Sequence, residues 1–159
     1  MHPDATLARL LATFPRAGGV EWIGIRPARH ATPQALPEVL ATDGGLLGDH
    51  YGGGKREVTL IQAEHLAVVA SLIGMPRIDP GLLRRNIVVA GINLVALKGR
   101  RFRVGAALLE HTGSCEPCSR MEEALGPGGY NAMRGHGGIT ARVLERGAIR
   151  LGDAVAPIA

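Results

Sequence analysis

Two cysteines, Cys115 and Cys118, lie in the stretch HTGSCEPCSRM, and their thiols are the side chains best suited to redox, metal or sulfur chemistry. The spacing fits a dithiol redox pair, which works where a helix begins in a strand-helix-strand setting. It also supplies half of the ligands of a zinc site. The remaining ligands would then be an acid or one of three histidines: His50, His111 and His136. Alternatively, both cysteines are small buried residues that contribute only to packing of the protein interior.

The two cysteines are predicted to differ in their surroundings. Pro117 directly precedes Cys118, and proline is favoured at the first position of a helix. The helix is therefore expected to begin around Pro117 to Ser119 and to continue through MEEAL, which places Cys118 in its first turn. The positive end of the helix dipole favours a thiolate there. Cys118 is predicted to be the functional thiolate, and Cys115 a neighbour on the incoming loop.

Polar side chains also gather beside glycines or at the start of a strand. They are Asp49, His50 and Lys55 in GLLGDHYGGGK, Arg84, Arg85 and Asn86 before the apolar run IVVAG, and Tyr130, Asn131, Arg134 and His136 in GGYNAMRGHGG. Glycine lets backbone amides approach a ligand closely, and guanidinium groups match carboxylate and phosphate. These segments permit an anion site, although a flexible loop or a solvated strand end would look the same. GLLGDHYGGGK lacks the residue order of a P-loop.

The composition of the chain disfavours nucleic-acid-binding and membrane-spanning proteins. The 159 residues fit one domain with a net charge of +4, and lysine occurs only at positions 55 and 98, so the charge is carried by arginine. The arginines are scattered and aromatic residues are few, which disfavours nucleic acid as a partner. No apolar run approaches the roughly 20 residues that span a bilayer, and no signal peptide is recognisable. We expect a cytoplasmic protein without a membrane partner.

Hydrophobic patterning predicts mostly strands. A peripheral helix is expected within Pro3 to Pro15, a strand at Val20 to Pro27, and an irregular segment over 28–57. Further expectations are a strand running into a helix over 56–74, a strand and a short apolar piece over 86–99, and two strands broken at Gly105. A glycine-rich loop at 126–138 and a terminal hairpin over 139–155, hinged at Arg146 and Gly147, complete the chain.

Only two or three helices are expected, and regular alternation of strands and helices is absent. These features predict a mainly β fold with peripheral helices, namely a barrel of mixed or antiparallel strands. Residues 1–19 are assigned to the N-terminal peripheral helix and residues 20–156 to a single domain.

In this order, the motifs resemble the MOSC domain family, named for the C-terminal domain of molybdenum cofactor sulfurases. The resemblance covers about residues 20–156 and is carried by GLLGDHY, VTLIQAEHL, LRRNIVVAGINL, ALLEHTGSCEPCSRM, GHGGITARVL and GAIRLGD. It implies a MOSC-type β-barrel whose cleft holds the molybdenum cofactor, a pterin with a phosphate and a dithiolene-bound metal. Cys118 matches the family cysteine that binds molybdenum in reductases of N-hydroxylated compounds or carries sulfur as a persulfide.

The resemblance also extends to the cofactor-binding residues. Arg84 and Asn86 match the family arginine and asparagine that contact the cofactor. Arg134 is expected to help hold the anionic cofactor. The loop with Asp49, His50 and Lys55 is expected at the rim of the cleft.

Partners follow from the resemblance. The chain is expected to lack the pyridoxal-phosphate desulfurase domain and the extra N-terminal β domain of some relatives, so pyridoxal phosphate binding is a property of the family only. A reductase would need a separate electron donor, because no flavin, haem or iron-sulfur motif occurs here. A sulfur carrier would need a separate cysteine desulfurase. A non-catalytic cofactor- or metal-binding module and a dithiol redox protein remain as alternatives.

Overall fold

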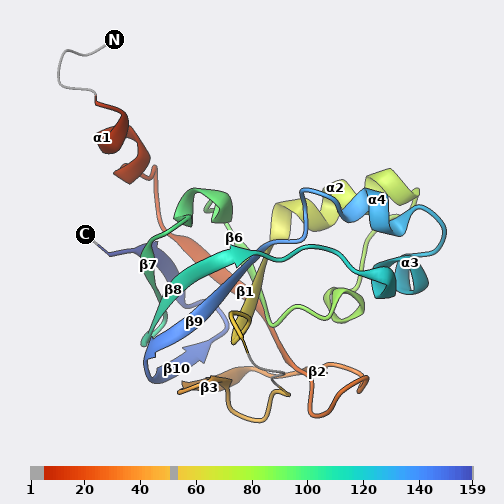
Figure 1. The fold of residues 1–159 in the computed structure, drawn as a ribbon, viewed down its shortest axis with the longest axis horizontal. Coiled ribbons are helices and arrows are strands. Elements are labelled where there is room, and N and C mark those ends of the chain that lie inside the picture. The colour runs from red at the N-terminus through yellow and green to blue at the C-terminus, as the bar shows by residue number, and fades with distance from the viewer. Residues whose placement is uncertain (1–5, 51–53, 159) are drawn as a thin grey trace.

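Seven strands close into a barrel in the structure of the chain, a computed structural model that describes residues 6–50 and 54–158 (Figure 1). Around the barrel the strands are β11 (Ala154–Pro157), β7 (Arg101–Val104), β8 (Ala107–Ser114), β9 (Ile139–Glu145), β5 (Val58–Gln62), β6 (Ile87–Ala90) and β1 (Gly18–Ile25). Pairing of β1 with β11 closes the circle. β5 and β6 run parallel, and the other neighbours run antiparallel. The predicted mixed β-barrel with peripheral helices is confirmed.

Strands β5 and β6 separate two hydrophobic cores. Because side chains alternate along a strand, Leu60 and Val89 point into the barrel with Phe102, whereas Ile61 and Val88 face outward. The outward residues are covered by helices, so the whole of β5 is buried. Burial on both faces suits its central apolar residues, and its two polar residues, Thr59 and Gln62, are buried with hydrogen-bond partners.

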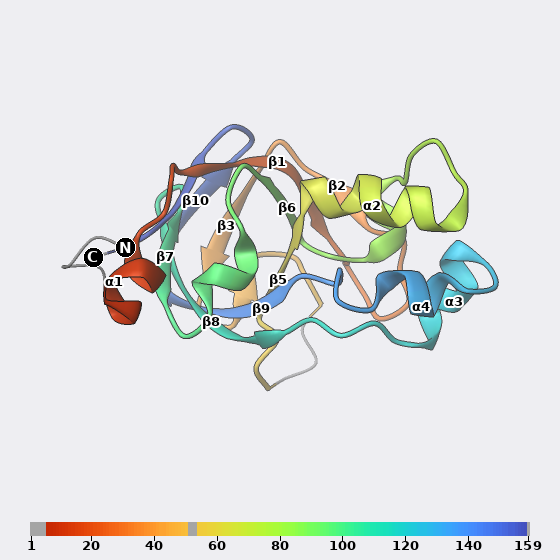
Figure 2. The same cartoon turned by 90° about the horizontal axis from the view of Figure 1, so that it is seen from above.

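The covering helices gather on one side of the barrel (Figures 1 and 2). They are α2 (Ala63–Ile73), α3 (Ser119–Leu125), α4 (Gly129–Met133) and the short 3-10 helix η1 (Pro80–Leu83); a second 3-10 helix, η2 (Leu94–Leu97), lies between β6 and β7. No helix in the described ranges combines the length and apolar character that a membrane crossing requires.

Helix α1 (Leu7–Ala12) confirms the predicted peripheral helix. The Thr6 hydroxyl accepts a hydrogen bond from the Arg9 amide at 3.2 Å and caps its start. The helix stands away from the barrel (Figure 1), and its side chains Leu7, Leu10 and Leu11 are exposed. Its apolar pattern predicted the helix correctly, and Phe14, just beyond the helix, packs against the barrel core.

Two sequence expectations about strands are wrong. The segment 28–57 contains β2 (Gln34–Ala35), β3 (Glu38–Thr42) and β4 (Gly45–Leu46), and the predicted terminal hairpin is absent: β10 (Gly147–Arg150) pairs with β3 instead of β9. A Cβ atom on Gly147 would lie 2.4 Å from the Ala106 carbonyl group, so the chain passes tightly over the β7–β8 turn at this glycine. It thereby leaves the barrel and joins the small sheet β10-β3-β4.

The expectations about helices also need correction. The glycine-rich segment 126–138 contains α4, and the described residues hold four α-helices rather than two or three. The Glu122 carboxylate on α3 accepts hydrogen bonds from the backbone amides of Gly128 and Tyr130, both at 3.0 Å. These two hydrogen bonds, the Glu122 clamp, fix α4 against α3. They stabilise a helix that the glycine-rich local sequence does not predict.

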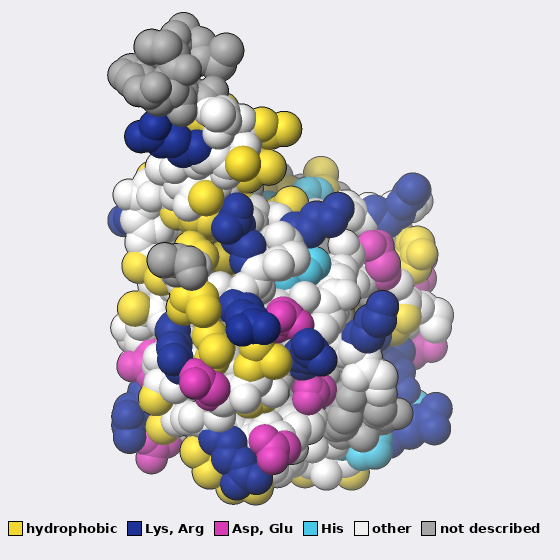
Figure 3. All heavy atoms as spheres, turned by 60° about the vertical axis from the view of Figure 1, so that its left-hand side comes forward, with side chains coloured by type: hydrophobic (Ala, Val, Ile, Leu, Met, Phe, Trp, Pro, Cys, Tyr) yellow, Lys and Arg dark blue, Asp and Glu magenta, His cyan; other side chains and the backbone are white. Residues whose placement is uncertain are grey.

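Exposed arginines on the barrel and on the small sheet pair with acids across strands. Glu110 bonds both Arg101 and Arg142, and Arg150 bonds Glu38 at 2.9 Å. Figure 3 shows basic and acidic side chains interspersed on one face of the molecule. Much of the arginine content therefore serves exposed ion pairs, which contribute little stability each.

The Glu122 clamp yields a stability prediction. Hydrogen bonds from the amides of Tyr130 and Gly128 lower the pKa of Glu122, so its stabilising effect is complete above the unfolded value of about 4.3 and is lost as pH falls through the lower folded pKa. Glu122→Gln should therefore lower the melting temperature at pH 7, with a difference that shrinks below about pH 4. Thermal melts across pH measure this. The exposed neighbour provides the control, since Glu123→Gln should show no such pH-dependent difference.

Candidate functional site

The two cysteines occupy different environments, and both are free thiols. Cys115 is 2% exposed, its amide donates to the Gly138 carbonyl at 2.9 Å, and its Sγ accepts a hydrogen bond from Arg56 at 3.3 Å. Cys118 is exposed and forms the N-cap of α3, one position before the predicted first turn. The two thiols therefore differ in exposure, and the functional role of Cys118 stays a prediction.

A buried guanidinium group organises the segment that carries the cysteines. Arg85 is 5% exposed and donates to the carbonyl oxygens of Leu83, Gly137 and Cys115 at 2.9, 2.9 and 3.3 Å. Burial lowers its pKa, and the nearby Cys115 acts in the opposite direction. Arg85 thus joins the end of η1, the loop before β9 and the cysteine segment at one point.

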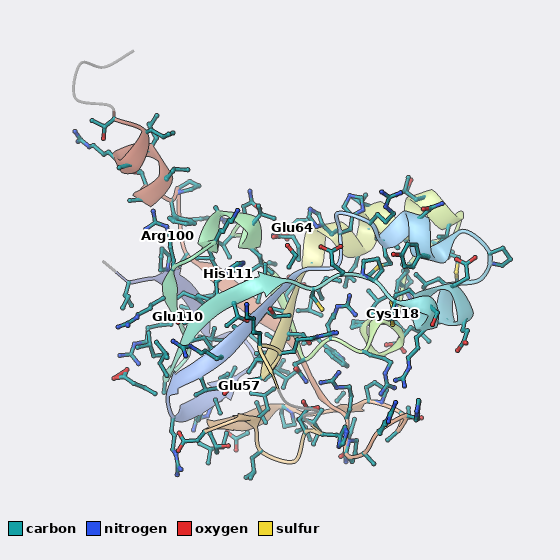
Figure 4. The ribbon with its side chains drawn as sticks, in the orientation of Figure 1. Glu57, Glu64, Arg100, Glu110, His111 and Cys118 are labelled. Atoms are coloured by element: carbon teal, nitrogen blue, oxygen red, sulfur yellow. The ribbon has the colours of Figure 1, made fainter. Side chains whose placement is uncertain are left out.

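Cys118 lies beside Arg84, the residue that follows η1 (Figure 4 labels Cys118 at the start of α3). Arg84 has left-handed backbone geometry at φ 58°, and its Nη1 donates to the Ala31 carbonyl at 2.7 Å. Its pKa is lowered by burial and then by the charges of Arg120 and Arg26, while Cys118 raises it. The thiol and the guanidinium group are therefore close enough to interact electrostatically.

Five arginines surround the cysteine segment, and we refer to them as the arginine cluster: Arg26, Arg56, Arg84, Arg85 and Arg120. Arg26 forms a two-pronged pair with Asp49, at 3.3 Å from Nε and 3.1 Å from Nη2. None of the other four forms an ion pair with a carboxylate within residues 6–50 and 54–158. The excess of positive charge makes this an anion-binding environment.

The loop before β2 is attached to this cluster. Arg120 contacts the His30 ring, with Nη2 at 2.5 Å from Nδ1, and its charge is the largest cause of a lowered pKa at His30. His30 itself has left-handed backbone geometry at φ 64°. Together with the bond from Arg84 to Ala31, this contact places the loop at the edge of the arginine cluster.

Asn86 lies inside the wall of the barrel. It is 0% exposed, its Oδ1 accepts from the amide and hydroxyl of Thr59, and its Nδ2 donates to the Gly24 carbonyl at 3.1 Å. The side chain bridges β5 and β1 on either side of β6. Its cofactor contact stays a prediction, whereas its hydrogen bonds to Thr59 and Gly24 fix the chain two residues beyond Arg84.

The predicted rim residues are spread more widely. The Asp49 side chain is 1% exposed and fixes Arg26, while His50 is exposed and its amide donates to the Arg26 carbonyl at 2.6 Å. Lys55 is exposed beside Arg56, and Arg134 is exposed at the end of α4. Tyr51 to Gly53, the centre of the glycine-rich loop, lie outside the described residues. The charges of Cys118 and Asp49 both raise the pKa of Arg84, so these three residues interact electrostatically, whereas the contacts of His50, Lys55 and Arg134 with the site stay predictions.

Three members of the cluster, Arg26, Arg56 and Arg120, are not among the candidate residues that the sequence suggests. Arg56 lies just before β5, so it stands at the start of a strand as Arg84 does, whereas Arg26 follows the end of β1. Arg85 was noticed beside Arg84, but its burial could not be read from the sequence. Zinc receives no support, because the described residues contain no group of three or more His, Cys, Asp or Glu able to hold a metal ion.

Comparisons with known proteins agree with the fold. The sequence pattern of the MOSC domain matches residues 47–156, whereas the curated proteins include no significant sequence match. The solved structure of the YUAD protein from Bacillus subtilis superposes with a TM-score of 0.79 at 23% identity, covering 90% of this chain and 97% of that chain.

Two YiiM structures are also similar. YiiM from Geobacillus stearothermophilus has a TM-score of 0.72 at 17% identity, covering 89% of this chain and 75% of that chain. YiiM from Escherichia coli has a TM-score of 0.72 at 19% identity, covering 91% of this chain and 71% of that chain. At these identities the likeness shows a shared fold.

The difference in exposure predicts how the thiols react. In the native protein, Ellman's reagent should modify Cys118 rapidly, and Cys115 should react only after unfolding in denaturant because it is buried. Cys118→Ser should abolish the rapid phase, and Cys115→Ala should retain it. Equal reaction rates for both thiols in the folded protein would contradict the assignment.

Arg85 predicts a large stability effect. Arg85→Met leaves three carbonyl groups without their donor and should lower the unfolding free energy by about 3 kcal/mol. Arg85→Lys keeps the charge but offers fewer fixed donors, so its unfolding free energy should lie between those of Arg85→Met and the wild type. The matched control is Arg84→Met, expected to cost below about 1 kcal/mol because Arg84 is less buried. Urea denaturation measures all three, and equal losses at both positions would be evidence against an organising role.

Proposed function

Since the chain belongs to the MOSC domain family, we propose that it binds the molybdenum cofactor and that the Cys118 thiolate is a ligand of the metal. The observation that carries the proposal is the exposed thiol of Cys118 beside an arginine cluster with an excess of positive charge. A soft thiolate suits a soft metal centre. Guanidinium groups suit the phosphate of the pterin.

The residues present fit this group. Cys118 would hold the metal, while Arg84 and Arg120 would bind the anionic parts of the cofactor from η1 and α3. Arg26 is held in place by Asp49 and can contribute its charge without reorientation. When bound, the molybdenum would supply two-electron redox chemistry.

Further residues act by positioning. Arg85 fixes the carbonyl of Cys115 and the loop before β9, so the following segment reaches Cys118 in a defined orientation. Asn86, the residue directly after Arg85, is hydrogen-bonded to Thr59 of β5 and to Gly24 of β1, which fixes the chain at this point. Arg134, His50 and Lys55 are proposed as contacts at the rim of the site, where exposed cations attract an anionic ligand.

The proposed reaction is reduction of a small N-hydroxylated compound. A separate electron donor is then required, and its docking surface would include the open side of the arginine cluster. In the second candidate, Cys118 carries sulfur as a persulfide received from a cysteine desulfurase. The same exposure of Cys118 that permits metal ligation favours that role, because a protein donor must reach the thiol.

Metal and pterin analysis of protein from a cofactor-proficient host tests the proposal. The wild type should hold molybdenum and pterin, and Cys118→Ser should lose most of the molybdenum. Cys115→Ala, the matched control, should keep it because Cys115 is buried and bonded to Arg56.

A wild type that stays empty after reconstitution, or a Cys118→Ser variant that holds as much metal, would refute metal ligation by this residue. Mass spectrometry after incubation with a desulfurase separates the second candidate. A gain of one sulfur atom on Cys118 would favour the sulfur carrier.

A further inference from the structure

A cavity of about 280 Å³ lies beside the cysteine segment, and its lining includes Cys115 and Glu116. Its walls come from η2, from β8 and the residues that follow it, from the start of α2 and from the loop before β9. The volume is close to the lower end of the range of small-molecule sites, roughly 300–1,000 Å³. In Figure 4, His111 marks the β8 wall and lies well apart from Cys118.

The walls of this cavity are held by hydrogen bonds within the protein. Gln62 accepts from the Leu94 amide at 2.9 Å and donates to the Ile92 carbonyl at 2.6 Å, which fixes η2 against the end of β5. The Gly99 amide donates to Nδ1 of His111 at 3.2 Å, which fixes the exit of η2 against β8. The cavity is therefore built into the fold.

Two side chains that can donate hydrogen bonds, Lys98 and His111, are among the residues that line the cavity. Because His111 accepts through Nδ1, its Nε2 carries the proton in the neutral ring. Burial and then the charge of Lys98 lower the pKa of His111, so the ring is neutral at pH 7 and Lys98 lies close to it. An ammonium group and an imidazole N–H together suit a carboxylate.

The remaining walls are chemically different. Leu94 and Ile139 are 1% and 2% exposed and line the cavity with apolar surface. On a third side, burial and then His136 lower the pKa of His65, whose ring stands edge-on to His136 at 5.0 Å. The lining also includes one acid, Glu116, whose side chain is exposed.

We propose that this cavity binds a small organic anion whose carboxylate contacts Lys98 and His111. Its compact apolar body lies against Leu94 and Ile139. Neither Cys118 nor Arg84 is among the described residues that line this cavity, although Cys115 and Gly137 of its lining are hydrogen-bonded to Arg85. The proposal does not depend on cofactor binding.

Titration of the cofactor-free protein, followed by NMR of the histidine rings, tests this proposal with acetate and benzoate as probes. Saturable changes should appear at His111, with benzamide, the neutral analogue of benzoate, binding at least about tenfold more weakly. Lys98→Met should weaken benzoate binding about tenfold or more. Arg77→Met removes the same charge at an exposed site beyond α2 and should bind like the wild type.

A second control, Cys118→Ser, should also bind benzoate like the wild type, so the result is independent of the proposed metal site. Melting temperatures verify that each variant is folded. The proposal is overturned if neither probe gives a saturable change at His111, if benzamide binds as tightly as benzoate, or if Lys98→Met has wild-type affinity.

Discussion

The buried guanidinium group of Arg85 is the interaction on which the candidate site depends. A cation with so little exposure is stable only because carbonyl oxygens replace its hydration, and here they come from η1, the cysteine segment and the loop before β9. These three segments are far apart in the sequence. Their common contact fixes where Arg84, Cys115 and Cys118 lie relative to one another.

The parallel pair β5 and β6 provides the frame for this contact. One face of each strand fills the barrel and the other face packs under α2, α3 and α4, so the strands cannot shift without disturbing both cores. Asn86 locks the start of β6 to both of its neighbours through buried hydrogen bonds. Arg84 and Arg85 directly precede Asn86, so the backbone at these two arginines is held in place as well.

Local sequence patterns predicted the positions of the helices and strands better than they predicted which strands pair. Alternating apolar residues and the proline at position 117 were sufficient for the barrel strands and the start of α3, whereas β10 pairs with β3, more than a hundred residues earlier in the chain. Likewise, α4 depends on a carboxylate from α3. Cys118 and Arg84 could be selected because each stands at a recognisable boundary. Arg26 and Arg120 become part of the site only through the fold, which brings the chain after β1 beside α3.

The central claim is that Cys118 supplies a sulfur ligand to molybdenum within a cationic site. X-ray absorption at the molybdenum edge counts the sulfur atoms bound to the metal, and it is the most direct test on cofactor-loaded protein. The account predicts one more molybdenum–sulfur bond in the wild type than in whatever loaded fraction of Cys118→Ser can be prepared. The same number of sulfur ligands in both proteins would contradict it.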